Sequence, residues 1–148
     1  MRPNKFRSRP VHYHGETFDS HLEFDRYLDL KCKEIRGEVS QIRRQVRFEI
    51  IPRQTREEHV HLKTKTKVVD RTVELGSFYT CDYLYREGDC IIIEDVKSSY
   101  TRTLPDYVLR RKLMVGKIAR HNATRPHCAR FVYRECEVTR RSFIIKDR

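Results

Sequence analysis

Hydrophobic and polar positions follow a helical period near the start of the chain. Between positions 19 and 36 apolar side chains recur at helical spacing, which predicts a helix with one buried face. Ser20 followed by Glu23 has the S-x-x-E form of a capping box, and Gly37 is a natural stop. The apolar stripe consists of Phe24, Tyr27, Leu28 and Ile35.

Period-two alternation of apolar and polar residues predicts strands further along the chain. A second helix is predicted over 103–120, where Pro105 is tolerated in the first turn. The order helix, strands, helix, strands indicates an α/β layered domain. The predicted strands cover 46–50, 78–86, 90–97, 131–138 and 142–146.

Two of these strands are expected to form a β-hairpin. The turn signal Glu87-Gly88-Asp89 separates 78–86 from 90–97, and both flanking segments are rich in β-forming residues. The run Ile91-Ile92-Ile93 indicates burial on both faces, which is typical of a central strand.

Two basic segments lie outside the predicted core. Residues 1–11 are expected to form a flexible arm. Residues 53–71 are rich in Lys, Arg, Thr and His and are expected to be an insertion, either an extended loop or a hairpin that touches DNA. The length of 148 residues otherwise suits a single domain over 1–148.

The charge balance narrows the choice of partner. The chain has a formal net charge of +11 and a sequence pI near 9.7, which favours a polyanion, with nucleic acid as the first candidate. An anionic membrane surface is the second candidate, although no apolar run approaches the roughly 20 residues of a membrane span. The candidate phosphate contacts are Arg43, Arg44, Arg47, Lys63, Lys65, Lys67, Arg110, Arg111 and Lys112.

The five cysteines give no sign of a disulfide framework or a zinc ribbon. Their number is odd and no two have C-x-x-C spacing. We interpret them as reduced thiols of a cytoplasmic protein.

The predicted hairpin also carries candidate chemistry. Asp95 and Lys97 share one face of their strand, because side chains alternate between faces. A two-residue loop at Gly88-Asp89 would place Asp82 directly opposite Asp95, and a loop shifted back by one residue would place it diagonally on the same face. A three-residue loop would instead place Glu94 opposite Asp82.

Carboxylates that oppose one another in a sheet repel, and burial increases the cost. A divalent cation between Asp82 and Asp95 would remove the conflict, and oxygen ligands suit Mg²⁺ or Mn²⁺. Lys97 could then orient or deprotonate a water, or hold a phosphate. The alternative is a surface hairpin with ordinary solvated charges.

Short motifs along the chain extend this hypothesis. They are Asn4-Lys5-Phe6, Phe18-Asp19-Ser20 with Glu23, Tyr27-Leu28-Asp29-Leu30, Gly37-Glu38-Val39, Cys81-Asp82-Tyr83, Glu94-Asp95-Val96-Lys97 and Arg111-Lys112-Leu113. In these motifs the chain resembles the small phage and prophage family DUF1064 and, more broadly, the PD-(D/E)XK nuclease superfamily. The resemblance covers about residues 4–117.

The resemblance implies a restriction-endonuclease-like α/β core, with a mixed central β-sheet flanked by helices. It implies Asp82 and Asp95 as metal ligands, Lys97 as the catalytic lysine, and Glu23 as a further group that holds a metal or its water. The capping role is the structural alternative for Glu23. The chain has Ser98 where the family usually has Gly after the lysine.

The function implied by the resemblance is metal-dependent DNA cleavage. We expect an endonuclease of the Holliday-junction-resolvase kind, acting on branched DNA in phage recombination or DNA processing. It would use Mg²⁺ or Mn²⁺, form a homodimer, and work in the cytoplasm of a bacterial host. The alternatives are a non-catalytic nucleic-acid-binding protein that keeps the fold, and a duplex-cutting nuclease of the restriction or repair type.

Overall fold

The computed structural model describes residues 9–139 and 142–148. The expected flexible arm over 1–11 lies outside the described residues as far as residue 8. Its last residue is not part of an arm, because Val11 begins β1 (Val11–Tyr13), which pairs antiparallel with β2 (Glu16–Phe18). Sequence analysis missed this small hairpin, whose strands of three residues each are too short to show a period.

The main elements follow the predicted order. Helices and strands after β2 are α1 (His21–Ile35), β3 (Ser40–Ile51), β4 (Gln54–His61), β5 (Thr66–Glu74), β6 (Ser77–Glu87), β7 (Cys90–Lys97), a 3-10 turn (Thr101–Thr103), α2 (Pro105–Thr124), β8 (Arg130–Val138) and β9 (Phe143–Asp147). Both predicted helices and all five predicted strands are confirmed, with shifted ends. The largest shifts are at β3, which begins six residues earlier, and at α2, which ends four residues later.

Contacts within the chain divide it into two compact units. The first combines the residues up to Val46 with Cys81–Arg148, and the second is Arg47–Thr80. The second unit contains the segment 53–71 that was expected to be an insertion, with wider bounds.

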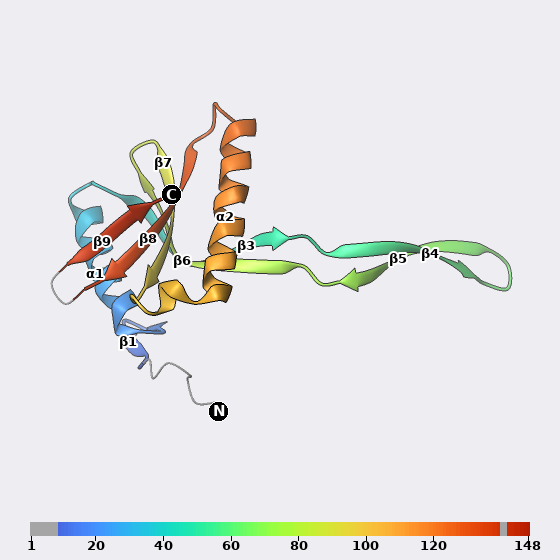
Figure 1. The fold of residues 1–148 in the computed structure, drawn as a ribbon, viewed down its shortest axis with the longest axis horizontal. Coiled ribbons are helices and arrows are strands. Elements are labelled where there is room, and N and C mark those ends of the chain that lie inside the picture. The colour runs from blue at the N-terminus through green and yellow to red at the C-terminus, as the bar shows by residue number, and fades with distance from the viewer. Residues whose placement is uncertain (1–8, 140–141) are drawn as a thin grey trace. The chain divides into compact units, whose positions relative to one another are not determined.

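A mixed five-stranded sheet organises the fold, with strand order β3-β6-β7-β8-β9 (Figure 1). Strand β7 pairs antiparallel with β6 and parallel with β8, and β8 pairs antiparallel with β9. The α/β class with a mixed sheet and two flanking helices is therefore confirmed. The predicted central strand is β7, where Ile92 and Ile93 point to opposite faces and are each 1% exposed.

The two helices cover opposite faces of the sheet. Arg26 of α1 bonds to Glu94 of β7, whereas Tyr107 of α2 bonds to Tyr133, whose hydroxyl reaches Asp95. Because Glu94 and Asp95 are adjacent in β7, their side chains lie on opposite faces. The face beneath α1 holds the main hydrophobic cluster of Leu30, Val39, Tyr83, Tyr85, Ile92, Val96 and Cys136.

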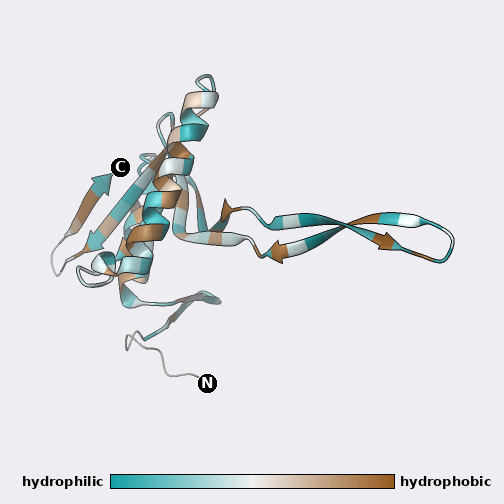
Figure 2. Cartoon of the chain, turned by 45° about the vertical axis from the view of Figure 1, so that its right-hand side comes forward, coloured by the Kyte–Doolittle hydropathy of each residue, from teal (hydrophilic) through white to brown (hydrophobic). Residues whose placement is uncertain are grey.

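Local sequence explains why both helices lie where they do. The backbone N–H of Glu23 donates to Ser20 Oγ at 3.2 Å, as the predicted N-cap requires. In α2 the buried residues Tyr107, Met114 and Ile118 fall on one stripe, and Figure 2 shows hydrophobic positions recurring among hydrophilic ones along this helix. Among the described residues, no helix is long and apolar enough to cross a membrane.

The second unit is built around a β-hairpin. Strands β4 and β5 pair antiparallel from Gln54↔Glu74 to His61↔Thr66 and form a separate two-stranded sheet. Of the two forms expected for residues 53–71, the structure therefore has the hairpin. Near its base Gly76 is closely approached, because a Cβ at this position would lie 3.1 Å from the carbonyl oxygen of Ile51.

Candidate functional site

The β6–β7 hairpin selects one of the three registers that the sequence left open. Glu87 pairs with Cys90, so the loop is the two-residue Gly88-Asp89, with Gly88 at a φ of +57°. The paired residues extend from this loop to Tyr83↔Glu94. Continuing by one residue places Asp82 opposite Asp95 on the face covered by α2.

The carboxylate of Asp82 replaces a backbone partner in the sheet. Its Oδ2 accepts a 2.7 Å hydrogen bond from the backbone N–H of Val96 and lies 3.3 Å from the Nζ of Lys97. Its Oδ1 lies 3.5 Å from the Nε2 of Gln45 in β3. The residue is 8% exposed, so its charge is largely withdrawn from water.

The carboxylate of Asp95 is held from two sides. Its Oδ1 lies 3.4 Å from Lys97 Nζ, and its Oδ2 accepts a 2.8 Å hydrogen bond from the hydroxyl of Tyr133. Lys97 thus lies between two carboxylates that neighbouring strands bring together, and its ammonium also lies 5.5 Å from the ring centre of Tyr107. Asp82, Asp95 and Lys97 therefore form one cluster of charged side chains, as the alternation of side chains along the two strands predicts.

Electrostatics in this cluster are strongly perturbed. Burial raises the pKa of Asp82 to about 7, and the neighbouring charges of Asp95 and Glu23 add to the rise against the opposing effect of Lys97. Burial alone would lower the pKa of Lys97, but Asp82 and Asp95 raise it above its ordinary value. Lys97 is therefore an ammonium, and it can donate hydrogen bonds or stabilise negative charge rather than accept a proton.

Glu23 lies in electrostatic reach of the cluster without joining it. Burial and the charge of Asp19 raise the pKa of Glu23, and Lys97 acts in the opposite direction. The backbone carbonyl of Glu23 accepts a 2.7 Å hydrogen bond from the hydroxyl of Tyr83, which fixes the start of α1 over β6. Within the described part of the chain, the carboxylates within 4.0 Å of Lys97 Nζ are those of Asp82 and Asp95.

The donor set can be compared with what a divalent cation needs. Among the described residues, no three or more His, Cys, Asp or Glu side chains are gathered as metal ligands. Mg²⁺ is often bound by only one or two carboxylates and keeps several waters. Asp82 and Asp95 fit that pattern, because they supply hard oxygen donors from adjacent strands, and because burial and then the charge of Asp95 raise the pKa of Asp82.

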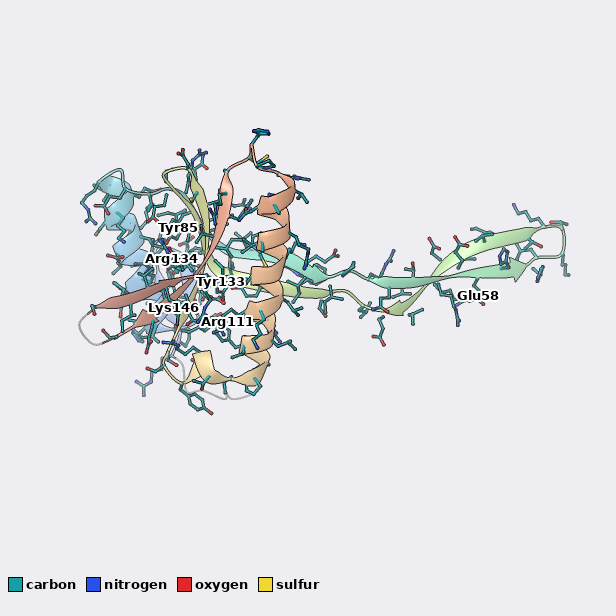
Figure 3. All side chains as sticks on the ribbon, turned by 45° about the horizontal axis from the view of Figure 1, so that its top comes forward. Glu58, Tyr85, Arg111, Tyr133, Arg134 and Lys146 are labelled. Carbon is teal, nitrogen blue, oxygen red and sulfur yellow. The ribbon has the colours of Figure 1, made fainter. Side chains whose placement is uncertain are left out.

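A chain of hydroxyls connects Asp95 to a second carboxylate, and sequence analysis missed it. The hydroxyl of Tyr107 lies 3.0 Å from that of Tyr133 and donates to Glu135 Oε2 at 2.7 Å. Arg111, which Figure 3 labels, donates from its Nη1 to the same oxygen at 3.2 Å. The parallel register pairs Asp95 with Glu135, so this buried row crosses from β7 to β8.

Glu135 is surrounded by cations. Its Oε1 has no hydrogen bond among the described residues, but Arg102 Nε lies 3.3 Å away as an ion-pair partner. Burial would raise the pKa of Glu135, yet hydrogen bonds from Tyr107 and Arg111 bring it below its usual value. Glu135 is therefore an anion committed to its own partners and is not a candidate metal ligand.

The opposite face of β7 carries a different network. Glu94 is fully buried and accepts bonds from Arg26 Nε at 2.7 Å, Arg26 Nη2 at 2.8 Å and the Tyr85 hydroxyl at 2.6 Å. Arg134 extends the network, because its Nη1 donates to the same Tyr85 hydroxyl at 3.1 Å (Figure 3). Glu94 therefore lies on the face of β7 opposite to Lys97, because side chains alternate between the faces of a strand.

The candidate phosphate contacts differ in availability. Arg44 is tied down, because its Nη2 donates to the Thr17 carbonyl and its guanidinium stacks 3.6 Å from the ring centre of Phe18. Arg111 is committed to Glu135. The guanidinium of Arg47 also stacks 3.7 Å from the ring centre of Phe78, although its side chain is exposed. The remaining candidates are exposed side chains: Arg43, Lys63, Lys65, Lys67, Arg110 and Lys112.

The fold and the charged cluster together define an α/β protein with two buried carboxylates on adjacent strands of its sheet. A family model matches residues 3–139, so the chain belongs to this family, DUF1064, described as a protein of unknown function. No curated protein matches the chain significantly, and neither does any solved structure.

Proposed function

We propose that this protein is a metal-dependent endodeoxyribonuclease of the PD-(D/E)XK type. The observation that supports the proposal most strongly is that Asp82 and Asp95, from adjacent strands, both lie within 3.4 Å of Lys97 Nζ. Two carboxylates and one lysine on adjacent strands are the side chains that metal-assisted phosphodiester hydrolysis uses. The excess of basic residues fits a polyanionic substrate.

Each residue of the cluster has a defined part in this proposal. Asp82 and Asp95 would hold Mg²⁺ or Mn²⁺, which when bound polarises the phosphate and makes a water more acidic. Lys97 carries a proton and donates to a phosphate oxygen or to the attacking water, where it stabilises developing negative charge. Glu23 contributes negative potential at the edge of the cluster and can bind a water of the metal.

The hydrolysis forms one bond and breaks one. The oxygen of water attacks phosphorus, and the bond between phosphorus and the leaving sugar oxygen breaks. The leaving oxygen takes a proton from solvent, the attacking water releases its proton to solvent, and Lys97 keeps its own proton throughout. Two hydrogen bonds favour this reaction, because the Tyr133 hydroxyl orients the Asp95 carboxylate and the Val96 amide orients the Asp82 carboxylate.

The substrate and the setting are proposed from the resemblance alone. A short basic member of the superfamily fits branched DNA of the Holliday-junction kind, cut in phage recombination or DNA processing. Symmetrical cutting of two strands calls for a homodimer, and such an enzyme would work in the cytoplasm of a bacterial host.

A non-catalytic DNA-binding protein is the second candidate. The observation that favours it is the absence of a three-ligand group among the described residues, together with a lysine that already neutralises part of the carboxylate charge. Such a protein would bind DNA through its basic surface and would cut nothing.

A cleavage assay with a matched pair of variants separates the two candidates. The substrates are four-way junction, flap and linear duplex DNA, each with Mg²⁺, Mn²⁺ or EDTA. We expect Asp82→Asn to reduce the cleavage rate about a hundredfold or more, because a metal ligand is lost while the shape is kept. Asp25→Asn, at an exposed position of α1, makes the same chemical change elsewhere and should cut normally.

The outcomes discriminate between the alternatives. Asp82→Asn should still bind DNA in EDTA as tightly as the unchanged protein, since the basic surface is intact. Cleavage that continues in EDTA, or that survives Asp82→Asn, contradicts the proposed site. Preferential cutting of linear duplex would replace the resolvase-like function with that of a duplex-cutting nuclease.

A further inference from the structure

Charge is unevenly distributed along the β4–β5 hairpin. The pairs Glu57↔Asp70 and Gln54↔Glu74 place carboxylates toward its base. From position 59 to position 69 there is no Asp or Glu, and three lysines alternate with threonines as Lys63, Lys65 and Lys67. We call residues 59–69 the hairpin end.

The lysines of the hairpin end have no internal counter-charge. All three side chains are exposed, and no described carboxylate lies within ion-pair distance of them. Closer to the base the situation differs, because Arg71 forms an ion pair with Glu58, which Figure 3 labels on β4. The hairpin end thus carries a concentrated positive potential that the fold itself does not use.

The ribbon is also poorly covered by its own unit. Its two strands form a sheet of their own, and Leu62 and Val68 in the hairpin end are 50% and 51% exposed. An isolated two-stranded hairpin is marginally stable in water, and a partner that covers Leu62 and Val68 would bury apolar surface that the described part of the chain leaves exposed. A two-stranded ribbon is narrow enough to enter the major groove of B-form DNA.

We propose that the hairpin end is a DNA-contact surface in which Lys63, Lys65 and Lys67 bind backbone phosphates of duplex DNA. The choice of DNA as the polyanion rests on the proposed nuclease function, while the surface itself rests on the charge distribution. This surface contributes affinity that does not depend on base sequence, and it contributes nothing to the bond-breaking chemistry at Asp82 and Asp95.

The test measures how DNA affinity depends on salt. A labelled duplex is titrated in EDTA over a range of salt concentrations with three proteins: the unchanged chain, a hairpin variant and a charge-matched control. The hairpin variant carries Lys63→Gln, Lys65→Gln and Lys67→Gln. The control carries Lys31→Gln, Lys33→Gln and Arg36→Gln near the end of α1, and both variants lower the formal net charge by three.

The expected result is quantitative. Loss of three phosphate contacts should make the slope of log affinity against log salt less negative by about 2.7, since each contact contributes about 0.9. The affinity gap between the unchanged chain and the hairpin variant should therefore narrow about 40-fold between roughly 50 and 200 mM salt. The control should keep the original slope, and the single change Lys65→Gln should shift the slope by about 0.9.

Three results would overturn the proposal. The first is an unchanged slope for a hairpin variant whose circular dichroism matches that of the unchanged chain. The second is an equal change in the control, which would reduce the effect to net charge. The third is a hairpin variant that loses more affinity for single-stranded RNA or for phosphatidylserine vesicles, measured as competitors, than for duplex DNA.

Failure here is distinguishable from failure of the proposed function. If the unchanged protein cuts DNA with Mg²⁺ but the slope stays the same, the nuclease proposal stands and the hairpin surface fails. If the slope becomes less negative in the hairpin variant as expected but no metal produces cleavage, the hairpin surface stands and the nuclease proposal fails.

Discussion

At the scale of single residues, Tyr133 sets the orientation of Asp95. It is fully buried, and its hydroxyl donates to the Asp95 oxygen that does not face Lys97. A carboxylate held in this way presents its other oxygen toward Lys97, which also contacts Asp82. Groups that orient metal ligands commonly contribute 10- to 100-fold, on the order of magnitude, to metal affinity or activity.

We therefore predict that Tyr133→Phe weakens Mg²⁺ or Mn²⁺ binding about tenfold, measured by calorimetry without DNA. The matched control is Tyr107→Phe, because the Tyr107 hydroxyl contacts Tyr133 and Glu135 but not Asp95. Both changes should reduce the free energy of unfolding similarly, by about 1–3 kcal/mol, since each leaves buried groups unpaired. Equal metal affinities in the two variants would assign Tyr133 a purely structural role.

Sequence analysis predicts Asp82, Asp95 and Lys97 but not Tyr133 or Glu135, for a physical reason. A tight turn and strand alternation fix what β6 and β7 bring together, and both signals are local. Tyr133 lies 38 positions from Asp95, and it reaches Asp95 through a parallel pairing whose register depends on how α2 packs. No pattern within one segment of the sequence predicts the register between β7 and β8.

At the scale of elements, Arg26 joins α1 to the central strand. Its side chain is 1% exposed, and its Nε and Nη2 donate two parallel hydrogen bonds to the Glu94 carboxylate. Its Nη1 also donates to Asp29, one turn along the helix. The sequence pattern did not reveal Arg26, because an arginine on a helix is usually exposed and its burial depends on where Glu94 lies. The helix itself was predictable, since its cap and apolar stripe are local.

We predict that Arg26→Met lowers the free energy of unfolding by about 3–5 kcal/mol, because it leaves the Glu94 carboxylate buried without its cation. The measurement is urea unfolding followed by circular dichroism. Lys31→Met on the same helix removes an exposed ion pair with Glu34 and should cost at most about 1 kcal/mol. A loss for Arg26→Met no larger than that of Lys31→Met would show that the pair does not hold α1 to the sheet.

At the scale of the whole molecule, the proposed cleavage site and the proposed DNA-contact surface belong to different units. The first unit holds the sheet, both helices and the carboxylate cluster, and the second holds the basic hairpin. Composition alone indicated a basic segment near 53–71, but it left open whether that segment is a loop or a hairpin. The choice depends on β4–β5 pairing, in which only a few positions, such as Val60 and Val69, are even partly buried.

We predict that Mg²⁺ stabilises the first unit, because a cation bound between Asp82 and Asp95 binds the folded chain only. At ten times the dissociation constant the gain is about 1.4 kcal/mol, or about 3–6 °C in Tm. Thermal melting with Mg²⁺, compared with the same ionic strength of NaCl, measures it. Asp82→Asn should lose the shift and Asp25→Asn should keep it, and a shift shared by both variants would place the ion elsewhere.

The position of Lys97 has a consequence for ion selectivity. By sitting between Asp82 and Asp95, its ammonium acts as a built-in counter-ion when no metal is bound. Because Lys97 already neutralises part of the charge of the two carboxylates, a monovalent ion such as Na⁺ is attracted only weakly, whereas a doubly charged ion gains about twice as much Coulomb energy at the same distance. Lys97 would thus help the site to select divalent cations over the abundant monovalent cations of a cell.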